Sequence, residues 1–166
     1  RIYVLGSFYP AFILDSLNDL LDNLSAGIQF NRQEVADGVD LGLLEGYLYM
    51  NITNITAHSI TSGISQLGWI TGSVLSVSSP AISLMRHDGD TVFAVSSNAN
   101  GGRLIVIGAE RQFYDDFIKE EASERLANQS MTWLIENNSR SDQNNVSFQV
   151  IVKDTILDLK DCNKTE

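Results

Sequence analysis

The chain has 166 residues, of which 43% are hydrophobic, and carries a net charge of −10. This length and apolar content predict a single domain with a sizeable core, covering residues 1–153 and followed by a charged tail, residues 154–166. The acidic balance argues against a nucleic-acid partner, whose phosphates require basic surfaces. No apolar run approaches the roughly 20 residues that cross a bilayer, so we expect no direct membrane insertion within the chain.

The first predicted elements are a strand and a helix. Ile2–Leu5 is an apolar run that predicts a strand. Ala11–Leu24 predicts a helix, because its apolar residues recur every three or four positions and form one stripe. Gly27 is expected to stop this helix, and Gly27–Asn31 to return as a short extended segment.

The middle of the chain carries short β-like segments separated by Gly, Pro, Ser and Asn. These segments are Leu43–Met50, Gly68–Ile70, Val74–Val77, Ala81–Met85 and Thr91–Ser96. Because no helical pattern lies between them, we expect antiparallel strands. Arg86–Asp90 contains Asp-Gly, which is typical of tight turns, and predicts a hairpin turn with a solvated His87.

The segment Gly101–Glu136 carries the strongest fold signal. Leu104–Ile107 is wholly apolar, which is typical of a strand covered on both faces, as in a parallel sheet packed between helices. A helix from about Phe113 to Glu136 follows, and Val146–Val152 alternates like a final strand. The pattern predicts an α/β fold with a mainly parallel sheet and added antiparallel segments.

Asparagine acceptor sites for N-glycosylation are unusually frequent. Seven of the 13 asparagines occur as Asn-x-Ser/Thr, where chance gives roughly two. They are Asn23, Asn51, Asn54, Asn128, Asn137, Asn145 and Asn163. This excess favours an exported glycoprotein, extracellular or on the cell surface. A single cysteine, Cys162, allows no internal disulfide, which suits an archaeal surface protein better than an animal ectodomain.

Several motifs together resemble the GIFT domains over about Ile2 to Asn137. Asn18-Asp-Leu-Leu-Asp22 followed by Gly27-Ile-Gln-Phe-Asn31 is similar to the family's N-x-L-L…G-I-x-F-N stretch. His58-Ser-Ile-Thr-Ser-Gly-Ile64 is similar to its H-P-I-T-x-G-I step, with Ser59 in the usual proline place. Three further segments complete the series: Val74–Ala81, Gly101–Gly108 and Trp133-Leu134.

The resemblance implies a flavodoxin-like, three-layer sandwich related to class I glutamine amidotransferases, usually without their catalytic residues. GIFT domains occur in gliding-motility ABC-transporter accessory proteins and in an intraflagellar-transport subunit. Related versions accompany subtilisin-like proteases. The family's first βαβ portion is missing before Arg1, so the chain is expected to be an incomplete piece of a longer polypeptide.

Residues that could carry chemistry are few. No Cys-His or Ser-His-Asp constellation is evident, so we predict no catalytic residues and no cofactor. Glu110 and Arg111 are ligand-binding candidates, because they follow the buried strand at the end where open α/β sheets bind ligands. Ser7 and His58 are further candidates, although His58 suits a structural role in a turn. For metals, Asp88 and Asp90 are weak calcium candidates in a turn that favours Asp on backbone grounds.

These observations predict a non-catalytic binding or assembly module of an exported, N-glycosylated cell-surface protein. Its expected partners are other domains of the same precursor, other surface proteins, or further copies of itself. Two alternatives remain open at this point. One is an accessory domain of an exported subtilisin-like serine protease, and the other an extracytoplasmic accessory domain of an ABC transporter.

Overall fold

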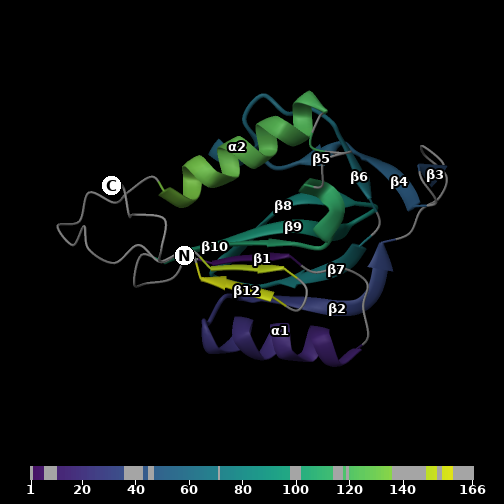
Figure 1. Ribbon diagram of the computed structural model, residues 1–166. Helices are drawn as coiled ribbons and strands as arrows, with labels where there is room; N and C mark the ends of the chain where they lie inside the picture. The colour runs from purple at the N-terminus through teal and green to yellow at the C-terminus, as the bar shows by residue number, and fades with distance from the viewer. Residues whose placement is uncertain are drawn as a thin grey trace.

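The computed structural model in Figure 1 describes residues 2–5, 11–35, 43–44, 47–70, 72–97, 102–113, 118, 120–135, 149–152 and 155–158. A nine-stranded sheet forms its centre, with the order β12-β11-β1-β10-β9-β7-β2; in addition β8 pairs with β9, and β5 pairs with β8. The strands are β1 (Ile2–Leu5), β2 (Ile28–Val35), β5 (Asn54–Ile55), β7 (Gly72–Val77), β8 (Ala81–His87), β9 (Asp90–Ser97), β10 (Arg103–Ile107), β11 (Gln149–Val152) and β12 (Thr155–Asp158).

The expectation of a mainly parallel, flavodoxin-like sheet is wrong. Among the described strands, parallel pairing is confined to β1, which lies between β10 and β11. All other pairs are antiparallel, including β10 with β9, β9 with β8 and β2 with β7. The physical reason is that an apolar run reports burial on both faces and says nothing about the direction of the neighbouring strand.

Two helices and a small sheet cover the faces of the large sheet. Figure 1 shows α1 (Ala11–Asn23) on one face and α2 (Glu121–Ile135) on the other. A three-stranded sheet of β3 (Leu43–Leu44), β4 (Tyr47–Ile52) and β6 (Leu67–Ile70) adds further cover beside α2. None of the helices in the described residues is long and apolar enough to cross a membrane.

Two hydrophobic cores result, one on each face of the sheet. Along β10 the side chains alternate between them: Leu104 and Val106 join the core under α1, whereas Ile105 and Ile107 join the larger core under α2. This alternation is the period-2 geometry of a strand. It explains why Leu104–Ile107 is apolar throughout, because neither face of β10 meets water.

Element boundaries depart from expectation where tertiary contacts set them. The long helix begins at Glu121 rather than near Phe113, which instead ends a 3₁₀ turn, η2 (Glu110–Phe113). The hairpin turn is confirmed but is shorter than expected. Its two central residues, Asp88 and Gly89, have positive φ angles of 47° and 94°, as type I′ hairpin turns require.

Candidate functional site

At the carboxyl end of β10, where the sequence predicts a ligand loop, Gly108 is hydrogen-bonded to the backbone of β7 and β9. Gly108 donates from its N–H to Val92 O at 2.9 Å, and its carbonyl accepts from Ser73 N at 2.8 Å. A Cβ at Gly108 would overlap the carbonyl oxygen of Ser73, and one at Gly72 would overlap that of Gly108. These two glycines therefore let the start of β7 lie against the end of β10.

Beyond Gly108 the chain turns into η2, and a buried glutamine holds it there. Gln112 is fully buried, and its Nε2 donates to Gly68 O at 2.9 Å and to Ser123 Oγ at 3.2 Å. It thus joins η2 to β6 and α2. The sequence did not reveal this contact, because the partner Gly68 lies 44 residues away along the chain.

The ligand-binding candidates do not come together as one site. Glu110 and Arg111 lie in η2, after the carboxyl end of β10, and their side chains fall outside the described residues, as does Ser7. His58 packs at the other end of β10. Its ring lies 5.6 Å from the ring of Trp133, over which Arg103, the first residue of β10, also stacks.

His58 has a defined structural environment. It precedes the 3₁₀ turn η1 (Ser59–Thr61), and its Nδ1 accepts from Ile60 N at 3.2 Å, which makes it the cap of that turn. The guanidinium of Arg103 lies 4.7 Å from the Trp133 ring centre and donates to the Trp133 carbonyl. Burial, and secondly the Arg103 cation, lower the pKa of His58 below its ordinary value of 6.5. A neutral imidazole is what the cap requires, because a protonated Nδ1 cannot accept.

η1 is also tied to α2 by polar groups. Gln129 donates from Nε2 to Ser62 O at 3.0 Å. Thr61 is buried, and its hydroxyl donates to Thr56 O at 2.7 Å. The segment His58–Ile64 is therefore held against α2 by Gln129 and to Thr56 by the Thr61 hydroxyl.

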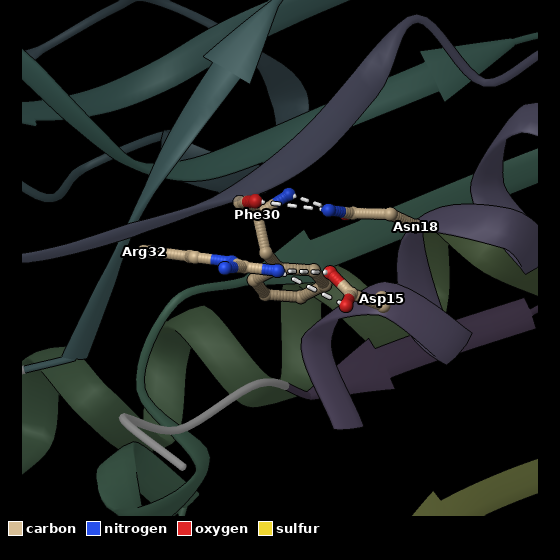
Figure 2. Close-up of polar contacts among 4 residues, drawn as sticks. All are labelled: Asp15, Asn18, Phe30 and Arg32. Atoms are coloured by element: carbon tan, nitrogen blue, oxygen red, sulfur yellow. Dashed lines mark hydrogen bonds and ion pairs between the residues drawn. The ribbon is translucent and has the colours of Figure 1, made fainter. Parts of the chain in front are cut away.

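The first resembling motif forms a polar clamp between α1 and the edge strand β2 (Figure 2). The Asn18 amide donates to Phe30 O at 3.0 Å and accepts from Phe30 N at 2.7 Å, so one side chain takes the place of a neighbouring strand. Arg32 forms an exposed ion pair with Asp15 at 3.1 Å. The clamp lies at the last regular pair, Phe30 with Leu75, before the register between β2 and β7 shifts.

In the hairpin, the solvent exposure of His87 differs from the prediction. The prediction of a solvated His87 is wrong, since its exposed fraction is 8%. The reason is that β8 continues to His87 before the turn begins. Asp88 is exposed, with its carboxylate 3.7 Å from His87 Nε2, and Asp90 accepts from Gln33 at 3.4 Å. In the described part of the chain, no three His, Cys, Asp or Glu side chains gather as metal ligands do.

Four of the seven glycosylation candidates fall in the described residues. Asn23 ends α1, Asn54 lies in β5 and Asn128 lies in α2, and all three side chains are exposed, whereas Asn51 in β4 is half-buried. The other three, Asn137, Asn145 and Asn163, lie outside the described residues, as does Cys162.

Comparison with known proteins defines the class of fold. No protein-family model and no curated protein matches the sequence. Among solved structures, the fold is shared with the N-terminal domain of mmIFT52, with a TM-score of 0.64 and 20% identity over 80% of this chain and 64% of that one. A cytoplasmic protein of Salmonella typhimurium LT2, STM1381, shares it with a TM-score of 0.56 and 11% identity, over 80% of this chain and 54% of that one.

The chain thus spans less than two thirds of the length of either solved structure. The likeness to an intraflagellar-transport subunit is consistent, at the level of the fold, with the resemblance to GIFT domains seen in the motifs.

Proposed function

We propose that the chain is a GIFT-type domain that serves as a non-catalytic binding or assembly module of an exported, N-glycosylated cell-surface protein. Its partners would be other domains of the same precursor, other surface proteins or further copies of the chain. The likeness to a domain of an intraflagellar-transport subunit supports the GIFT assignment.

The proposal that the domain is non-catalytic rests on one observation: the polar side chains of the motifs, Asn18 and His58, form contacts within the fold. Asn18 binds both backbone groups of Phe30. His58 accepts from Ile60 N at Nδ1, and its ring makes a T-shaped contact with Trp133. A nucleophile's base must instead be free to accept a proton from the reacting group. The contacts of Asn18 and His58 within the fold support a non-catalytic module.

Replacing His58 tests this part directly. His58→Asn keeps a side-chain oxygen that can cap η1, since Asn is a good cap, but removes the imidazole base. We expect the wild-type protein to show no amide or ester hydrolysis, and the variant to match it in folding. Hydrolysis by the wild type that His58→Asn abolishes would overturn the proposal.

The export part rests on the excess of acceptor asparagines and on the exposure of Asn23, Asn54 and Asn128. An exposed side chain can bear a bulky glycan without disturbing the core. Expression behind a secretion signal in a glycosylating host tests it by intact mass before and after enzymatic deglycosylation. Glycan loss on treatment is expected; a secreted protein with no glycan at any acceptor would contradict export.

A further inference from the structure

The solvent face of α2 carries exposed apolar side chains. Met131 is 50% and Ile135 48% exposed, four residues apart on the helix. Leu126, Trp133 and Leu134 occupy the opposite, buried face. Contacts with the sheet therefore leave the Met131–Ile135 pair uncovered.

An acceptor asparagine lies in the same stripe. Asn128 precedes Met131 by three residues and Ile135 by seven, so all three fall within about 60° on the helix surface. Side chains three residues apart are neighbours on a helix surface, so Met131 lies beside Asn128. Asn128 is itself exposed.

Ser130, the third residue of the acceptor motif Asn128-Gln129-Ser130, is otherwise unexplained. It is fully buried, yet its Oγ has no hydrogen-bond partner among the described residues. A buried hydroxyl in that state destabilises a fold, and serine is a weaker helix former than alanine. Alanine would suit the packing better, so the hydroxyl points to a requirement other than stability.

We propose that Asn128 carries an N-linked glycan whose first sugars lie over Met131 and Ile135. This inference rests on the proposed export. In the transfer, Asn128 Nδ2 bonds to C1 of the first sugar, and the bond from C1 to the phosphate oxygen of a lipid-linked oligosaccharide donor breaks. The lipid phosphate leaves with the electron pair of that bond, and the proton from Nδ2 passes to it or to solvent. The apolar C–H faces of the sugar rings then cover the stripe, and such cover is favourable for apolar surface.

Methionine oxidation offers a specific readout. Of the three methionines, Met50 and Met85 are fully buried and Met131 is half exposed. Mild peroxide should therefore oxidise Met131 in the folded protein, and oxidation of the other two would reveal unfolding. The full chain is secreted from a glycosylating host as wild type, Ser130→Ala, Asn128→Gln and the control Asn54→Gln.

We expect glycopeptide mapping to find a glycan at Asn128 in the wild type and its loss in Ser130→Ala and Asn128→Gln. Both variants should oxidise Met131 several-fold faster, as should enzymatically deglycosylated wild type, whereas Asn54→Gln should oxidise it at the wild-type rate. Ser130→Ala should unfold at the same denaturant concentration as the enzymatically deglycosylated wild type or a higher one.

Three results would overturn the inference. Glycans at other acceptors with Asn128 bare would refute it while export stands, and would leave the stripe to a protein partner. A glycan at Asn128 that does not slow the oxidation of Met131 would refute the proposal that its sugars cover Met131 and Ile135. A secreted chain without any glycan would refute export itself and this inference with it.

Discussion

At His58 one side chain is an acceptor, a ring partner and a titrating group. Its Nδ1 accepts from Ile60 N, its ring makes a T-shaped contact with Trp133, and Arg103 lies over the same tryptophan. The sequence marks His58 as a candidate for ligand binding, and the structure gives its Nδ1 and its ring a role within the fold. Its proton affinity is consequently linked to the stability of the fold.

A pH dependence follows from that linkage. Because burial and Arg103 lower the folded pKa of His58 below 6.5, the unfolded chain binds the proton more tightly. The stability that neutral His58 contributes is present above pH 6.5 and is lost as the pH falls through the lowered pKa. Urea unfolding between pH 7.5 and 5 should therefore show a steeper loss in the wild type than in His58→Asn. Parallel profiles of the two proteins would contradict the assignment.

Gly108 also determines a close contact in the fold, because its lack of a side chain lets the start of β7 lie against the end of β10. Gly108→Ala places a methyl group against the Ser73 carbonyl, which is backbone and cannot rotate away. We expect about 2–3 kcal/mol of destabilisation, at the upper end of overpacking costs, measured by urea unfolding. Gly89→Ala is the control: it meets open space but keeps an unfavourable positive φ, and should cost about 1 kcal/mol. Equal losses at both sites would argue against the close contact.

At the scale of elements, the polar clamp between α1 and β2 contains one strong contact and one weak contact (Figure 2). Asn18 satisfies two backbone groups of an edge strand, whereas Asp15 and Arg32 are 57% and 68% exposed. Solvent screens the exposed ion pair and weakens it. The two hydrogen bonds of Asn18 satisfy part-buried backbone groups of Phe30, which would lose these partners without it.

Asn18→Ala should therefore destabilise the fold by about 1–3 kcal/mol, and Arg32→Ala by about 0–1 kcal/mol. Denaturant unfolding of the two variants measures the difference, and hydrogen exchange at the Phe30 amide locates it. A larger loss for Arg32→Ala, or unchanged exchange at Phe30 in Asn18→Ala, would count against the clamp.

Elements that are determined by neighbouring residues could be predicted from the sequence, whereas elements that depend on distant contacts could not. The periodicity of Ala11–Leu24 and the Asp-Gly turn are local signals, and both are confirmed, with α1 ending at Asn23. The start of α2 and the two residues of β5 depend on contacts with distant segments, and the sequence did not reveal them. Asn18 and Gln112 were missed as contacts because their partners lie 12 and 44 residues away.

For the whole molecule, the sheet separates two cores that should act independently. Leu21 belongs to the core under α1 and Leu126 to the core under α2, and both are fully buried. Leu21→Ala and Leu126→Ala should each cost about 2–5 kcal/mol. The double variant should show their sum within about 0.5 kcal/mol, because the sites share no partner. Unfolding of all three variants tests this, and strong coupling would mean that the sheet transmits strain between its faces.

The sequence by itself determined most of the buried apolar segments, the Asp-Gly chain reversal and the negative net charge. Apolar periodicity, Gly conformations and charge are properties of single residues and near neighbours. The tertiary structure alone decided strand direction, the close crossing of β7 and β10 at Gly72 and Gly108, and the contact of His58 with Trp133. These depend on which distant segments meet. A buried strand looks the same in sequence whether its neighbour runs parallel or antiparallel.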